Sequence, residues 1–222
     1  MSDTAQRFFS TIRRALGREA APDPEAIEAE RRALMAAPAP RPKWSGDDVT
    51  RLLTRLEAAA ATSERIASRA DIPAAVARVL LDAGAPGGPV QIGADPLLAG
   101  LEWTQEVTVA KGIDGVRTAP ASVTVAVAGI AETGTLVLRS GPDNPTSLNF
   151  LPEHHVVVLR AGDVVDYMET AWARLHADGD LPRTVNFITG PSRTGDVEQT
   201  IELGAHGPRR LHVLLLEDHD QL

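Results

Sequence analysis

The chain contains no cysteine, and its aromatic side chains are scarce. Its 222 residues include no Cys, and aromatic residues make up 4% of them. The missing thiols exclude disulfide bonds and cysteine ligation of zinc or of an iron–sulfur cluster. Any electron-transfer centre must therefore lie on a partner protein. Val, Ile, Leu and Ala have to fill the core, and the hydrophobic content of 43% is ordinary for a globular protein.

Long apolar segments and an excess of basic charge are also missing. The longest apolar run, near residues 123–131, is far shorter than the roughly 20 residues that span a bilayer. No secretory signal is visible at the N-terminus. The net charge of −8 repels nucleic acid and acidic membrane surfaces. We therefore expect a cytoplasmic protein that binds neither nucleic acid nor membrane.

The N-terminal region differs in charge from the rest of the chain. Its first 45 residues hold eight basic and six acidic side chains, although the whole chain is acidic. Apolar residues at helical spacing (Phe9, Ile12 and Leu16) predict a helix that stops at Gly17. A second helix is expected over residues 23–36. The arm either packs on its own domain or docks on a partner subunit.

A proline-rich linker separates this arm from the main region. Prolines stand at alternate positions from 38 to 42, which predicts a stiff connection. We therefore divide the chain into an N-terminal helical arm with its linker, residues 1–44, and an α/β domain, residues 45–222.

Helical and strand patterns alternate along the main region. Ser45 and Asp48 resemble a capping box at the start of one helix, Asp71 is expected to cap a second, and Asp163 a third. The expected strands cover residues 90–92, 106–110, 122–128, 135–138, 155–159, 184–189, 199–203 and 211–216. This alternation is typical of βαβ units, and hairpin-like spacing late in the chain indicates a mixed sheet.

The first candidate site is the polar turn at residues 129–135. Glu132, Thr133, Gly134 and Thr135 interrupt two apolar strands. Glycine permits a sharp turn and the close approach of a ligand, and turn amides can bind an anion. Glu132 at the end of a buried strand is a candidate catalytic acid, base or nucleophile. The alternative is a hairpin turn with a solvated Glu132.

The second candidate site is the loop at residues 190–196, which follows an expected strand. The carboxyl end of a strand is the usual ligand side of an open α/β sheet. Ser192, Thr194 and Asp196 offer polar groups, and Arg193 could clamp an anion. The segment lacks the Gly-Lys-Ser/Thr ending of a P-loop. An ordinary turn with an exposed Arg193 is the alternative.

The third candidate site is the corner at residues 205–210. His206 could donate a hydrogen bond or transfer a proton near neutral pH, and Gly207 beside it could contact a substrate. The alternative is a loop that faces solvent. His154 and His155 begin an expected strand, where His155 is interpreted as a core histidine with satisfied hydrogen bonds. No standard metal-ligand spacing or cofactor motif is found, so we predict no metal and no cofactor.

Four sequence blocks resemble the lactate utilisation protein C group of the LUD-domain family. They are GIAETGTLVL at residues 129–138, LPEHHVVV at 151–158, GPSRTGDVEQTIELGAHGP at 190–208 and RRLHVLLL at 209–216. The order of the blocks agrees, and the resemblance covers roughly residues 122–216. It implies a three-layer α/β/α fold with a Rossmann-like mixed sheet, like that of sugar-phosphate isomerases and coenzyme A transferases, here with an N-terminal helical extension.

The resemblance also implies a function. The family takes part in oxidising L-lactate to pyruvate, alongside partner subunits that carry iron–sulfur clusters. One hypothesis is an accessory subunit that binds a small anionic metabolite. The other is a small-molecule enzyme or sensor of the transferase or isomerase type that uses Glu132, with Arg193 as the anion clamp and His206 as a hydrogen-bonding group.

Overall fold

The computed structural model describes residues 3–17, 23–37, 41–109, 119–142, 144–177, 179–195 and 201–217. The chain divides into two compact units, Met1–Trp44 and Ser45–Leu222. The first unit holds two helices, α1 (Asp3–Ala15) and α2 (Pro24–Ala36). Asp23 caps α2 by accepting a hydrogen bond from the amide of Glu25. Neither helix buries a side chain.

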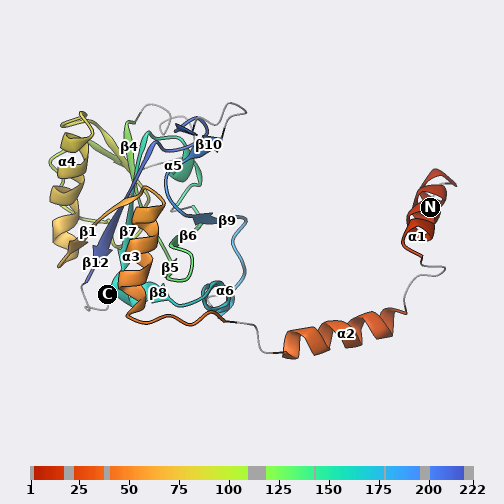
Figure 1. Cartoon of the computed structure of the whole chain (residues 1–222). Coiled ribbons are helices and arrows are strands. Elements are labelled where there is room, and N and C mark those ends of the chain that lie inside the picture. The colour runs from red at the N-terminus through yellow and green to blue at the C-terminus, as the bar shows by residue number, and fades with distance from the viewer. Residues whose placement is uncertain are drawn as a thin grey trace. The chain divides into compact units, whose positions relative to one another are not determined.

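A parallel sheet of six strands is the centre of the second unit (Figure 1). Every neighbouring pair in it is parallel. The strands, in spatial order, are β1 (Thr62–Ile66), β12 (Arg210–Leu216), β7 (His154–Arg160), β4 (Ala121–Val125), β2 (Val90–Ile92) and β3 (Val107–Val109). The middle strands are buried on both faces, which explains their continuous runs of Val, Ile and Leu.

A second sheet of four strands packs on the first. Its order is β8 (Val164–Val165), β5 (Ala128–Ile130), β6 (Thr135–Arg139) and β9 (Val185–Ile188). β6 is antiparallel to both of its neighbours, while β5 and β8 are parallel. A separate antiparallel ribbon joins β10 (Arg193–Gly195) and β11 (Ile201–Leu203).

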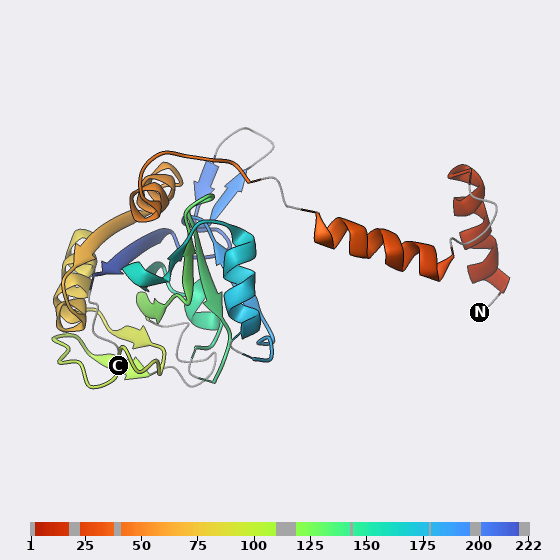
Figure 2. The same cartoon turned by 90° about the horizontal axis from the view of Figure 1, so that it is seen from below.

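Helices cover the outer faces of this double layer (Figure 2). α4 (Ile72–Asp82) packs on one face of the six-stranded sheet, in a cluster that includes Val76 and Leu214. α3 (Asp48–Ala58) and β6 share the other face, where Leu52 and Leu136 meet Val157. α6 (Met168–Ala177) covers the far side of the four-stranded sheet. Three short elements complete the unit: η1 (Arg69–Asp71), α5 (Ser147–Phe150) and η3 (Ala161–Asp163).

The predicted α/β class, with a mostly parallel central sheet flanked by helices, is confirmed. In the part of the chain that the structure describes, the antiparallel pairs lie outside the six-stranded sheet. Within that same part, each helix falls short of the length and apolar character that crossing a membrane requires.

The prediction of a single strand over residues 122–128 is wrong. The chain crosses here from β4 in the six-stranded sheet to β5 in the four-stranded sheet. The amide of Ala126 donates to the carbonyl of Val158 in the six-stranded sheet. The next amide, that of Val127, donates to the carbonyl of Val137 in the four-stranded sheet. The apolar pattern continues through the crossing because both sheets face buried surroundings.

The helix starts also differ from the expected ones. Asp47, not Ser45, caps α3 and accepts a hydrogen bond from the amide of Thr50 at 2.8 Å. The carboxylate of Asp71 accepts from the amide of Ser68 and so closes η1 rather than capping α4. Asp163 ends η3, which leads into β8, so α6 begins only at Met168.

Candidate functional site

A cavity of about 310 Å³ lies where the two sheets, α5 and the β10 ribbon meet. Small-molecule sites have volumes of roughly 300 to 1,000 Å³, so the cavity is at the lower end of that range. The residues that line it are Asn149, Phe150, His155, Phe187, Ile188, Thr189, Gly190, Pro191, Ser192, Arg193, His206, Gly207, Pro208 and Leu211. Two of the four phenylalanines of the chain are therefore in this one place.

Backbone hydrogen bonds join the two loops on one side of the cavity. The amide of Ser192 donates to the carbonyl of Pro208 at 2.9 Å, and the amide of Gly204 donates to the carbonyl of Ser192 at 3.0 Å. A Cβ at Gly207 would lie 3.1 Å from Cβ of Ser192, so the corner packs tightly against the residue that precedes β10. On another side, the hydroxyl of Ser122 donates to the carbonyl of Leu148 at 2.6 Å and ties α5 to β4.

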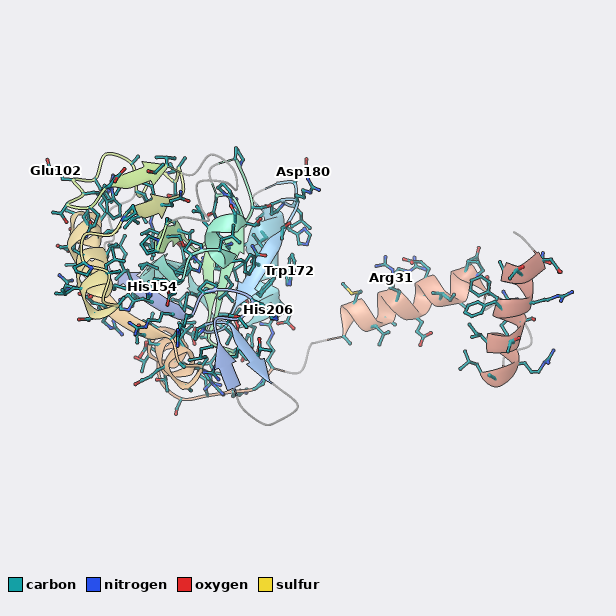
Figure 3. The ribbon with its side chains drawn as sticks, turned by 90° about the horizontal axis from the view of Figure 1, so that it is seen from above. Arg31, Glu102, His154, Trp172, Asp180 and His206 are labelled. Atoms are coloured by element: carbon teal, nitrogen blue, oxygen red, sulfur yellow. The ribbon has the colours of Figure 1, made fainter. Side chains whose placement is uncertain are left out.

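The structure brings together four of the expected site residues. Ser192 and Arg193 come from the second candidate loop, and His206 and Gly207 come from the third. Arg193 and His206 are exposed, while Ser192 is half-buried. Figure 3 shows His206 beside the β10–β11 ribbon. The second loop holds two further residues that were expected in the site. Thr194 lies on β10 and outside the cavity lining, and Asp196 lies outside the described residues.

The first candidate loop occupies a different place. Residues 131–134 form the turn between the antiparallel strands β5 and β6, and Glu132 in it is half-buried. The amide of Glu132 donates to the carbonyl of Asp166 at 3.0 Å, next to the start of α6. Glu132, Thr133 and Gly134 are not among the residues that line the cavity.

A chain of hydroxyl groups nevertheless connects this turn to the cavity. The hydroxyl of Thr133 lies 2.7 Å from that of Thr135, which in turn lies 2.6 Å from that of Thr189. Thr189 lines the cavity, whereas Thr135 is buried. Thr135 therefore supports the cavity wall through Thr189 but does not itself line the cavity.

Two glycines of the candidate loops make room for a helix. Gly134 has a φ of +71°, and a Cβ there would lie 2.4 Å from Cβ of Arg55. Gly190 has a φ of +96°, and a Cβ there would lie 2.5 Å from the carbonyl oxygen of Ala59. The space that these glycines leave is thus filled by the end of α3, although close approach to a ligand was expected at the first of them. Gly190 still contributes its backbone to the cavity lining.

Two deeply buried polar side chains form part of the cavity wall. Asn149 and His155 are each only 1% exposed. Neither amide atom of Asn149 has a hydrogen-bond partner among the described residues, and the same holds for Nδ1 of His155. Nε2 of His155 lies 2.8 Å from the hydroxyl of Thr124. Burial lowers the pKa of His155 to about 3, so the imidazole is neutral at physiological pH.

These two residues were not in the predicted site. The sequence predicts a core histidine at position 155 with both ring nitrogens hydrogen-bonded. His155 is indeed buried in the core, but among the described residues only one of its ring nitrogens has a partner. Asn149 lies after a stretch rich in Pro, Asn and Ser, a composition that predicts an exposed loop. The surrounding sequence holds no signal for its burial, because α5 packs on β4, a strand that comes earlier in the chain, as well as on β7.

The cavity lies at the opposite edge of the parallel sheet from the one expected. His155 and Leu211 are the second residues of β7 and β12, so the cavity is at the amino ends of these strands. The loop at residues 190–196 does follow the carboxyl end of a strand, but that strand, β9, belongs to the four-stranded sheet. The ligand rule for open parallel sheets therefore does not apply to this loop.

Metal ligation finds no support in the described ranges, where no three His, Asp or Glu side chains come together in a way that could hold an ion. His154 is buried at the start of β7, but on the face that packs toward α4, away from the cavity. Burial lowers the pKa of His154 as well.

The parallel sheet, its helical layers and the polar cavity beside it define an α/β domain with a candidate small-molecule site. The chain belongs to the LUD domain family, whose family model matches residues 49–216. "Lactate utilization protein C" of Geobacillus kaustophilus is 28% identical over 211 residues, which cover 80% of this chain and 87% of the relative. The protein of the same name from Bacillus licheniformis is 33% identical over 153 residues, covering 60% and 64%.

A solved structure supports the fold. A DUF162 family protein from Deinococcus radiodurans superposes with a TM-score of 0.59 and 21% sequence identity. The match covers 79% of this chain and all of the other.

Proposed function

We propose that this protein is a cytoplasmic accessory subunit for the oxidation of L-lactate to pyruvate, and that it binds a small carboxylate in the cavity. Membership of the LUD domain family and the likeness to relatives named lactate utilization protein C support the role in lactate utilisation. The chain has no cysteine with which to hold an iron–sulfur cluster. The proposal therefore assigns the electron-transfer centres to iron–sulfur partner subunits.

The single observation that carries the binding proposal is the cavity with cationic and polar groups on its wall. The guanidinium of Arg193 matches a carboxylate in shape and charge and can donate two parallel hydrogen bonds. The hydroxyl of Ser192 and the ring of His206 supply further hydrogen-bonding groups beside it. Because Glu132 and Thr133 are outside the lining, the proposal gives them no contact with the ligand.

Calorimetric titration with L-lactate and with pyruvate tests the binding. We expect saturable binding by the wild-type protein and an affinity loss of roughly tenfold or more for Arg193→Ala, because a charged hydrogen-bond donor is removed. Arg183→Ala is the matched control, since Arg183 is exposed and outside the cavity lining, and it should bind as the wild type does. Equal affinities for Arg193→Ala and the wild type would overturn the assignment of the cavity.

Deletion of the gene in its native host tests the pathway. We expect growth on L-lactate as sole carbon source to fail, growth on pyruvate to continue, and the full chain to restore growth on lactate. Purification of the tagged full chain from lactate-grown cells should also recover protein-bound iron and acid-labile sulfide. Normal growth of the deletion strain on lactate would refute the role in lactate oxidation.

A further inference from the structure

One part of the cavity wall holds exposed side chains, including the cationic Arg193, and another part holds neutral, buried ones. Arg193 and His206 are open to solvent, whereas Asn149 and His155 are 1% exposed. A ligand that contacts both sets must carry an anionic group where water remains and a neutral polar group where water is excluded. The two ends of the wall thus call for two different chemical groups on one molecule.

From this arrangement we infer that Asn149 and His155 determine specificity, and that they select carboxylates that carry a hydroxyl or carbonyl oxygen over carboxylates that lack one. The inference rests on the proposed function, because it assumes that the cavity binds a small carboxylate. Neither residue belongs to the set that the sequence patterns singled out for binding. Both act by contact with the neutral oxygen of the ligand, while Arg193 holds the carboxylate.

Asn149 presents hydrogen-bonding groups that a ligand in the cavity can use. Its carboxamide offers two N–H donors and an acceptor oxygen, and none of them has a partner in the described part of the chain. A buried polar group without a partner is unfavourable, so a ligand that supplies the missing bonds gains affinity. A ligand with a methylene group at the same place leaves the carboxamide unpaired and gains nothing.

The neutral state of His155 is the second argument. In a neutral imidazole one nitrogen donates and the other accepts a hydrogen bond. Nε2 takes one of these roles toward Thr124, so Nδ1 has the opposite role available. A hydroxyl group of the ligand can donate or accept a hydrogen bond, so it can pair with Nδ1 in either tautomer. A carbonyl oxygen can only accept, so it pairs with Nδ1 when Nδ1 carries the proton.

Charge burial excludes a second carboxylate at this end. Among the residues that the structure describes, no cationic side chain accompanies Asn149 and His155 on the buried part of the lining. An ionised carboxylate placed there would lose its hydration without a counter-charge, which is strongly unfavourable. The buried end therefore favours a monocarboxylate with a neutral oxygen over a dicarboxylate of similar size.

Titration calorimetry with four related acids tests the inference on the full chain. The probes are L-lactate, pyruvate, propionate and malonate, which differ in the group that would meet Asn149 and His155. We expect the wild-type protein to bind L-lactate and pyruvate roughly tenfold or more tightly than propionate and malonate. Asn149→Leu, which keeps the branched shape of the side chain and removes its polar atoms, should lower the ratio of lactate affinity to propionate affinity severalfold, while propionate affinity stays the same or rises.

Two further variants separate specificity from folding. His155→Gln should also lower the lactate-to-propionate ratio, because the amide side chain cannot reproduce the position of Nδ1. Asn186→Leu is the matched control, since Asn186 also has an unpartnered buried amide nitrogen but is outside the cavity lining. It should keep the wild-type ratio. Circular dichroism of each variant verifies the fold before titration.

The titrations distinguish carboxylate binding in the cavity from selection of the ligand by Asn149 and His155. Wild-type binding of propionate as tight as that of L-lactate, or an unchanged ratio in folded Asn149→Leu, would overturn the inference and leave the proposed function intact. If none of the four acids binds the wild type, the proposed carboxylate site fails, and the selectivity fails with it.

Discussion

Nε2 of His155 and the hydroxyl of Thr124 lie 2.8 Å apart across the neighbouring parallel strands β7 and β4. This contact fixes the ring on the face of the sheet that looks toward α3 and β6. The ring is 1% exposed, and burial holds its pKa at about 3, well below the ordinary value of 6.5. His155 is therefore neutral when folded and takes up a proton readily only in the unfolded chain.

This difference predicts a pH dependence of stability. Between about pH 6.5 and 3 the unfolded chain binds a proton at His155 that the folded chain does not bind, so the free energy of unfolding falls as the pH falls. The fall from this one group is about 1.4 kcal/mol per pH unit at most. Burial also lowers the pKa of His154 and His212, which adds to the same trend.

Urea denaturation at several pH values between 7 and 4 checks this prediction. His155→Gln removes the titrating group, so its free energy of unfolding should fall less steeply with decreasing pH than that of the wild type. Parallel curves for the two proteins would show that His155 is protonated in the folded state over this range.

Neighbouring positions on α5 should respond in opposite ways to substitution. Leu148 is fully buried, and Leu148→Ala should lower the free energy of unfolding by about 2–5 kcal/mol through lost burial and a cavity. Asn149→Leu removes two unpartnered buried polar atoms, and the adjoining cavity has space for the larger side chain, so stability should stay the same or rise. Urea denaturation at pH 7 measures both. A large loss of stability in Asn149→Leu would mean that the carboxamide is hydrogen-bonded when the protein is folded.

Gly134 should not tolerate a side chain. Its φ of +71° is unfavourable for other residues, and a Cβ would lie 2.4 Å from Cβ of Arg55 on α3. We expect Gly134→Ala to cost about 2 kcal/mol or more and to lower Tm by roughly 4 °C or more. Gly162→Ala is the control, because nothing lies within 4 Å of a Cβ there and its φ is not positive. Similar Tm values for the two variants would contradict a tight contact between the β5–β6 turn and α3.

Local patterns predicted most of the strands because buried strands carry a simple apolar signal. Residues 90–92 and 211–216 agree closely with β2 and β12. The pattern failed at Ala126 and Val127, where the chain changes sheets without a change in hydrophobicity. Which sheet a strand joins is decided by long-range pairing, and a sequence window contains no information about it.

The candidate site was predictable to the extent that it lies on polar loops. Polar or glycine-rich segments between the apolar strands drew attention to Ser192, Arg193, His206 and Gly207. The structure places all four of these residues on one cavity. Glu132 stood out for the same reason, yet its turn packs beside the start of α6. Asn149 gave no signal, since its burial depends on the packing of α5 against β4 and β7.

The cavity has walls from two separate sheets, and the last turn of α3 packs against both of these sheets. β7 and β12 supply one wall and β9 the other. Arg55 and Ala59 lie against Gly134 and Gly190 in loops of the four-stranded sheet, and Leu56 shares a hydrophobic cluster with residues of β12. The last turn of α3 thus acts as a spacer that sets how far apart the walls stand. We therefore expect substitutions in this turn to alter the affinity for the proposed carboxylate ligand, although its side chains are outside the cavity lining.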